Sequence, residues 1–101
     1  MKDKEDHFQL LRKIQKRPES SQRELAEELG FSLGKLNYCL KALQQKGLIK
    51  INNFEKNKDK INYLYILTPR GIEHRLKLTI KFMKKKMQEY DELKTEVNKG
   101  N

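Results

Sequence analysis

Residues 21–47 constrain the fold of this chain more than any other segment. They read SQRELAEELGFSLGKLNYCLKALQQKG, two short amphipathic stretches joined by a sharp corner. Ser21 and Glu24 have the spacing of a capping box, in which each side chain accepts the backbone amide of the other residue. Gly30 can adopt the left-handed conformation that ends a helix, and Ser32 can cap the next one. The segment therefore predicts a helix-turn-helix.

Both predicted helices are apolar on one face and polar on the other. The apolar residues at helical spacing are Leu25, Ala26 and Leu29 in the first helix and Leu36, Leu40 and Leu43 in the second. The outward face of the second helix carries Lys35, Asn37, Tyr38, Lys41 and Gln45. None of these five is acidic, and Lys, Asn and Tyr side chains can contact phosphates and base edges. This face is a candidate for contacts with DNA, although the same residues would also suit an ordinary solvated helix face.

The overall charge points to the same class of partner. The 101 residues hold 23 Lys and Arg against 14 Asp and Glu, which gives a formal net charge of +9 and a pI of 9.7. A polyanion is therefore the first partner to consider. Charge alone does not decide the matter, because lysine-rich genomes encode many basic proteins that bind no nucleic acid.

The start of the chain and its few reactive side chains exclude several functions. Residues 1–6 hold no apolar run, so we expect no signal peptide, no membrane span and a cytoplasmic protein. A single cysteine, Cys39, excludes an internal disulfide, and we expect it to be a small packed residue beside Leu40. His7 and His74 lack metal-ligand spacing. With no nucleophile–base pair or glycine-rich phosphate loop either, we expect no catalytic residue, no enzyme activity, no metal and no cofactor.

The segments around the helix-turn-helix predict a further helix and a hairpin. Residues 6–17 form a helix by pattern, which Pro18 ends. Its apolar stripe consists of Phe8, Leu11 and Ile14, with Leu10 beside it. Residues 48–51 and 61–67 predict paired strands, the second with both faces largely apolar and therefore covered. Residues 52–60 between them are nearly all polar, and we expect a flexible basic loop too long for a tight turn.

Lysines in this loop and hydroxyls at the helix starts complete the candidate interface. A charge run is usually solvated, but Lys56, Lys58 and Lys60 lie where a hairpin tip can reach a phosphate. Residues at a helix start either cap the helix or contact phosphates, because the free amides and the positive end of the dipole favour anions. The candidate DNA-binding residues are Ser21, Gln22, Ser32, Lys35, Asn37, Tyr38, Lys41, Lys56, Lys58 and Lys60.

The C-terminal segment predicts a long helix with an apolar seam. Thr68 and Pro69 are a strong helix start, and no breaker follows until Gly100. Alternating spacings of four and three, the pattern of a coiled coil, relate Leu76, Ile80, Met83, Met87, Tyr90 and Val97, with Lys94 as the exception. The stripe would suit packing on the chain's own sheet, but a helix of about 30 residues spans roughly 45 Å, more than one small domain covers. We therefore expect dimerisation through Leu76, Ile80, Met83, Met87 and Tyr90.

The charges of this helix are sorted along its length. Basic residues occur from Arg75 to Lys86, and acidic residues from Glu89 to Glu96. A parallel pair would set the lysines of both chains side by side, whereas an antiparallel pair brings the basic half near the acidic half of the partner. The sorting predicts an antiparallel homodimer.

The predicted order of helix, helix, helix, strand, basic loop, strand and helix is that of a winged helix, and the chain resembles MarR-type transcriptional regulators. The resemblance is carried by Glu24-Leu25-Ala26, Gly47-Leu48-Ile49 and Leu67-Thr68-Pro69-Arg70-Gly71. Within that group the chain is most similar to the small MarR-family regulators associated with exopolysaccharide gene clusters, over residues 8–50 and on to about 97. The resemblance implies a dimeric bacterial regulator whose second helix-turn-helix helix enters the major groove of double-stranded DNA, with the wing along the minor groove.

We therefore expect a mainly α fold with a small β-hairpin, in which residues 1–68 form a winged helix-turn-helix and residues 69–101 a coiled-coil-like dimerisation helix. The chain departs from the family's pattern at Asp59-Lys60-Ile61, where the family usually has an Asp-x-Arg motif. It also lacks the extended helical region that usually binds phenolic effectors, so the resemblance does not support a small-molecule effector. The alternative to a DNA-binding regulator is a winged helix that binds RNA or another protein.

Overall fold

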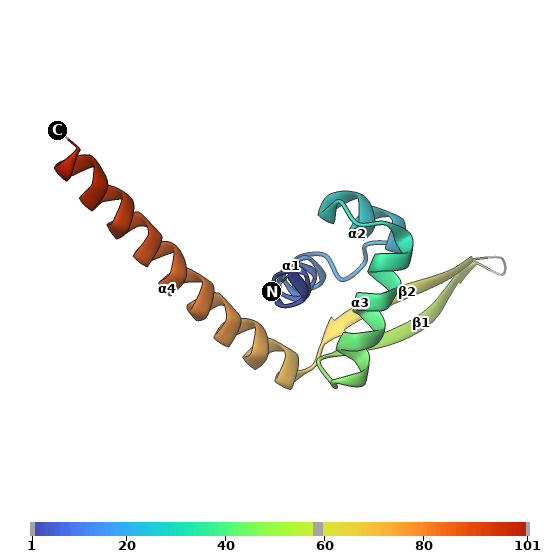
Figure 1. Cartoon of the computed structure of the whole chain (residues 1–101). Coiled ribbons are helices and arrows are strands. Elements are labelled where there is room, and N and C mark those ends of the chain that lie inside the picture. Colours follow the sequence, from blue (N-terminus) through green and yellow to red (C-terminus); the bar gives the residue numbers. More distant parts are fainter. Residues whose placement is uncertain (1, 58–59, 101) are drawn as a thin grey trace.

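The computed structural model describes residues 2–57 and 60–100, with side chains described for residues 4–52 and 64–100. Over these residues the chain forms four helices and one two-stranded antiparallel sheet (Figure 1). The elements are α1 (Lys2–Lys16), α2 (Gln22–Leu29), α3 (Leu33–Gln45), β1 (Ile49–Asn57), β2 (Lys60–Leu67) and α4 (Pro69–Lys99). This confirms the expected winged helix fold, mainly α with a small hairpin and a long C-terminal helix.

The first helix starts earlier than its apolar pattern predicted, at Lys2 rather than at Asp6. Its first residues are charged, so they extend the helix without adding to the apolar stripe from which the start was read. The helix ends at Lys16, just before Pro18, as expected because the residue before a proline is disfavoured in the helical conformation.

The predicted caps of α2 and α3 are present. The Ser21 hydroxyl accepts the backbone N–H of Glu24 at 3.1 Å, and Ser32 accepts that of Lys35 at 3.1 Å. Gly30 ends α2 with a φ of +70°. The capping box differs in one detail, because the Glu24 carboxylate accepts the hydroxyl proton of Ser21 at 3.1 Å instead of its amide proton.

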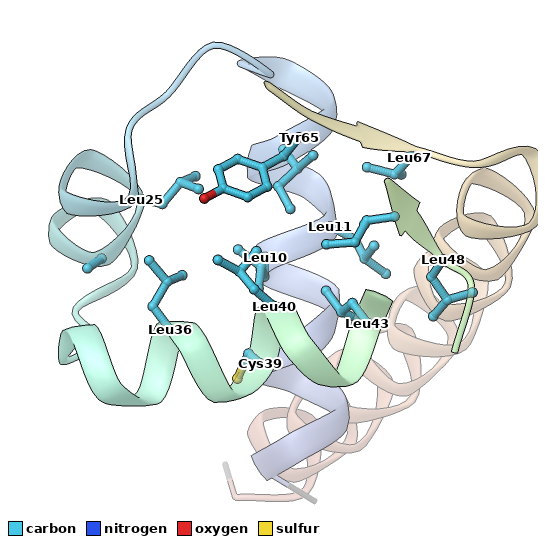
Figure 2. Packing of buried hydrophobic residues seen from close by; sticks show 13 residues of the cluster. Leu10, Leu11, Leu25, Leu36, Cys39, Leu40, Leu43, Leu48, Tyr65 and Leu67 are labelled. Carbon is cyan, nitrogen blue, oxygen red and sulfur yellow. The ribbon is translucent and has the colours of Figure 1, made fainter. Parts of the chain in front are cut away.

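The hydrophobic core lies where the three N-terminal helices meet the base of the hairpin. Figure 2 shows Leu10 of α1, Leu40 of α3 and Tyr65 of β2 converging on its centre. The remaining buried members of this cluster are Leu11, Ile14, Leu25, Ala26, Leu36, Cys39, Leu43, Leu48, Ile49 and Leu67. Cys39 is packed, as predicted, and the helix-turn-helix is held in place by side chains from every neighbouring element.

The hairpin is longer than the sequence pattern predicted. Strand β1 continues to Asn57, with Asn52 paired to Leu64 and Phe54 paired to Asn62, so most of the expected loop over residues 52–60 is strand. The prediction was wrong because main-chain hydrogen bonds hold such a ribbon together without an apolar pattern. A register shift between Glu55 and Asn57 marks an irregularity near its end.

The two faces of β2 also differ from the expectation that both are covered. Tyr65 and Leu67 point into the core and are buried, whereas Ile66 is 37% exposed. The expectation was wrong because the core lies on one side of this two-stranded sheet, and alternate residues of a strand point to opposite faces.

Helix α4 begins at a tight junction and then leaves the domain. The Thr68 hydroxyl accepts the backbone N–H of Gly71 at 3.0 Å and donates to the carbonyl of Gly47 at 2.7 Å. Leu78 is buried, and the ring of Phe82 stacks on that of Phe8 of α1 with 4.9 Å between the centroids. Beyond this point α4 extends away from the winged domain (Figure 1), which gives the chain its longest dimension of 67 Å.

Candidate nucleic-acid interface

Helix α3 presents the face that the sequence predicted. Its apolar residues Leu36, Leu40 and Leu43 are buried in the core. The residues left exposed are Lys35, Asn37, Tyr38, Lys41 and Gln45. Tyr38 is 68% exposed, so its ring is open to a ligand and is not packed on the domain. The face therefore offers amide, phenol and ammonium groups of the kinds that contact base edges and phosphates.

Lys35 lies at the edge of this face and has two partners within the domain. Its Nζ is 3.1 Å from Oδ2 of Asp6 on α1, and it sits 4.3 Å from the centre of the Phe31 ring. A phosphate bound by Lys35 would share this ammonium with a carboxylate. This ion pair could not be predicted from the local pattern, because Asp6 comes from a different helix.

The centre of the exposed face includes a glycine that sequence analysis passed over. Gly34, Tyr38, Lys41 and Gln45 follow one another at helical spacing. A Cβ at Gly34 would have open space around it, so packing within the domain does not require glycine there. Glycine inside a helix costs about 0.5–1 kcal/mol relative to alanine, and no contact within the domain offsets that cost here. Gly34 could have been noticed from the sequence, because it is a glycine on the polar face of an amphipathic helix with no local reason for being there.

The structure describes the predicted contact residues at the helix starts in full, and those on the wing in part. Ser21 and Ser32 are exposed and cap their helices, and Gln22 is half-buried at the first turn of α2. The backbones of Lys56 and Lys60 lie on β1 and β2, and their side chains are outside the described residues. Lys58 lies outside the described residues altogether.

Among the described residues, no three His, Cys, Asp or Glu side chains come together as a metal site would require. No helix in residues 2–57 and 60–100 combines the length and the apolar character needed to cross a membrane.

The helix-turn-helix matches a known family. A profile described as winged helix-turn-helix DNA-binding matches residues 7–50, from α1 to the start of β1. No curated protein sequence matches the chain at a significant level. The chain thus has the winged helix fold, and residues 7–50 are similar to the DNA-binding proteins that this profile describes.

Solved structures extend the likeness beyond that domain. FabT of Streptococcus pneumoniae, solved in complex with DNA, shares 27% identity over 82% of this chain and 58% of its own, with a TM-score of 0.62. ZitR of Lactococcus lactis, described as a zinc-responsive MarR family member, shares 26% identity over 89% and 58%, with a TM-score of 0.61. PcaV, a transcriptional regulator of Streptomyces coelicolor, shares the fold at a TM-score of 0.68 with 14% identity over 94% and 74%.

The chain is therefore structurally similar to transcriptional regulators, one of which is described as a MarR family member. It spans 58% of the length of FabT and of ZitR.

Proposed function

We propose that the chain is a sequence-specific regulator of transcription that binds double-stranded DNA as a homodimer. The observation that carries the proposal is the exposed face of α3, where Asn37, Tyr38 and Lys41 project from a winged helix-turn-helix. The likeness to FabT supports it, because that protein was solved with DNA bound. The function is one of binding, without a catalytic step.

In this proposal residues 1–68 read the DNA and residues 69–101 join the two protomers. Helix α3 enters the major groove, where each base pair presents its own pattern of donors and acceptors. Asn37 and Tyr38 contact base edges. Lys41, the helix-start residues Ser21, Gln22 and Ser32, and the wing lysines Lys56, Lys58 and Lys60 contact phosphates. Lys35 adds a phosphate contact at the edge of the face, shared with Asp6.

The seam of α4 supports the dimer. Leu76, Ile80, Met83, Met87 and Tyr90 are between 47% and 65% exposed, so the chain's own sheet does not cover them. A continuous apolar stripe of this kind is a surface that soluble proteins bury against a partner. We propose that a second copy covers it in an antiparallel arrangement, with the basic half of each α4 near the acidic half of the other.

The proposal also covers the location of the protein and the genes that it controls. We place the protein in the bacterial cytoplasm and assign it to the control of exopolysaccharide genes, on the resemblance of its sequence to regulators of such gene clusters. Selecting bound fragments from a random duplex pool tests the function directly. An enriched palindrome is expected, whereas enrichment of nothing, or tighter binding of RNA, would contradict it.

Binding to duplex DNA should weaken steeply as salt is added. If a dimer neutralises about eight phosphates, the plot of log K against log salt concentration should have a slope near −7, because each neutralised phosphate releases condensed counterions. Fluorescence anisotropy of a labelled duplex at several salt concentrations measures the slope. An affinity that salt leaves unchanged would rule out this phosphate-bound mode.

Replacing Asn37 or Tyr38 with alanine should reduce discrimination more than it reduces general affinity. A good base contact is worth about 1–3 kcal/mol of preference, so the ratio of selected to random duplex affinity should fall roughly five- to a hundredfold. A Lys41→Ala variant is the matched control, because losing a phosphate contact weakens all sequences alike. If both alanine variants keep the wild-type ratio, these residues do not read bases.

A further inference from the structure

Apart from the lysines of the α3 face, a row of basic side chains runs along the solvent-exposed side of α4. Arg70, His74, Lys77, Lys81 and Lys85 recur at spacings of four, three, four and four, and all are exposed. Lys46, at the end of α3, joins the row at its start. There a surface hollow of about 350 Å³ is lined by Lys46, Leu48, Arg70, Glu73, His74 and Lys77. We call these six basic residues, five on α4 and Lys46, the basic ridge.

The basic ridge lies off the apolar seam and away from the exposed face of α3, although Lys77, Lys81 and Lys85 also belong to the basic half of α4 that the proposed dimer sets near the partner's acidic half. Lys81 and Lys85 are each two residues from Met83, about 160° around the helix from it, and Lys81 is about 100° from Ile80, the seam residue before it. The ridge therefore stays exposed when the seam is covered. It begins at the C-terminal end of α3, far from Gly34, and follows α4 away from the winged domain (Figure 1).

The positive charge of the ridge is poorly balanced. Within the described residues Glu73 is the acid paired with it, at 3.3 Å from Lys77, and both side chains are well exposed. Burial and the neighbouring charges of Lys46, Lys77, Arg70 and Lys4 keep the pKa of His74 below its ordinary value. Burial disfavours a charge of either sign, so it is the four cationic neighbours, and not the lowered pKa itself, that would favour an anion there.

We propose that the basic ridge binds the phosphate backbone of a second DNA duplex, separate from the one read by α3. The inference rests on the proposed function, since it takes the chain to be a DNA-binding protein. From Arg70 to Lys85 the ridge is about 22 Å long, which matches roughly six base pairs of a straight duplex. Lysine and arginine along a helix contact phosphates without reading sequence, so the second duplex is bound regardless of its sequence.

Duplex DNA fits the ridge better than a membrane surface does. A helix that binds lipid inserts apolar side chains beside its basic ones. The large exposed apolar residues of α4 are those of the seam together with Ile72 and Leu93, and none of them stands in the row of basic side chains from Arg70 to Lys85. The ridge also ends where acidic residues begin, which limits the contact to one short segment of a rigid polyanion.

Capture of a second duplex tests the proposal. The selected duplex is fixed to beads and saturated with full-length protein, and a labelled duplex of unrelated sequence is then added. The ridge variant is Lys81→Gln with Lys85→Gln. The control variant, Lys86→Gln with Lys99→Gln, removes the same charge from exposed positions of the same helix. All three proteins should bind the fixed duplex within about twofold, and the ridge variant should capture roughly tenfold less of the labelled duplex.

The outcomes separate the two proposals. If the wild type does not bind the fixed duplex, the proposed function fails and the ridge proposal fails with it. The wild type could bind the fixed duplex while the two variants capture equal amounts of the labelled duplex. Only the ridge proposal is then overturned, because the labelled duplex would be bound by a free α3 of the dimer and not by the ridge. Loss of binding to phosphatidylserine vesicles in the ridge variant, with capture unchanged, would overturn it in favour of lipid.

Discussion

Replacing Met83 and Met87 with aspartate should leave the protein monomeric at micromolar concentration. Both side chains lie at the middle of the seam, and Met87 is 62% exposed in the single chain. Burying a methionine side chain stabilises by about 1.5–3 kcal/mol. The variant dimer loses four buried methionines and must bury four carboxylates, whose loss of hydration is costly. The dimer should weaken by more than about a thousandfold, which sedimentation velocity of both proteins would detect.

A matched variant separates loss of the seam from added charge. Gln88→Asp with Thr95→Asp places two aspartates on the same helix at exposed positions outside the seam. This control should remain dimeric, and its affinity for a selected palindrome should stay near that of the wild type. A wild type that sediments as a monomer, or a seam variant that still dimerises, would remove α4 from the interface.

The direction of the pair can be tested by cross-linking. Because Cys39 is buried, alanine is the replacement that leaves its site apolar. In this background a new cysteine near Met83 lies close to its counterpart in either direction, whereas one at Val97 meets its counterpart only in a parallel pair. The charges favour antiparallel pairing by only a few tenths of a kcal/mol for each exposed pair. Efficient disulfide formation at Val97 would therefore overturn the charge-sorting argument.

The caps, corners and inward faces could be predicted from the sequence because each depends on residues a few positions apart. Ser32 caps α3 through an amide three residues away, and the φ of Gly30 is set within a single residue. The seam of α4 is a similar case, since its spacing is visible along one helix. Its exposure agrees with the expectation that one small domain does not cover a helix of this length.

What the sequence did not reveal depends on residues far apart in the chain. The ion pair between Lys35 and Asp6 joins two helices, and it changes how that lysine can meet a phosphate. The extended hairpin depends on main-chain pairing, which polar side chains do not signal. The exposed Ile66 depends on which side of the sheet the core lies. In each case the local pattern was compatible with more than one tertiary arrangement.

Gly71→Ala, at the junction between the winged domain and the exposed part of α4, should destabilise the protein strongly. A Cβ at Gly71 would overlap the Leu48 carbonyl, whose oxygen also accepts the Thr68 amide at 3.0 Å. Both sides of this contact are backbone, so neither can rotate away. Overpacking of this kind costs about 1–3 kcal/mol or more. For a domain of this size we expect the melting temperature to fall by roughly 10 °C or more.

Gly34→Ala is the matched control, because a Cβ there meets open space and removes the cost of glycine in a helix. Its melting temperature should equal or exceed that of the wild type, whereas a Gly71→Ala variant that melts within about 2 °C of the wild type would contradict the close approach. The contact matters for function because Leu48 follows directly from α3 and Gly71 lies in the first turn of α4. In the proposed dimer, this backbone contact relates the direction of each α3 to the seam, and so sets the distance between the two half-sites that the dimer can read.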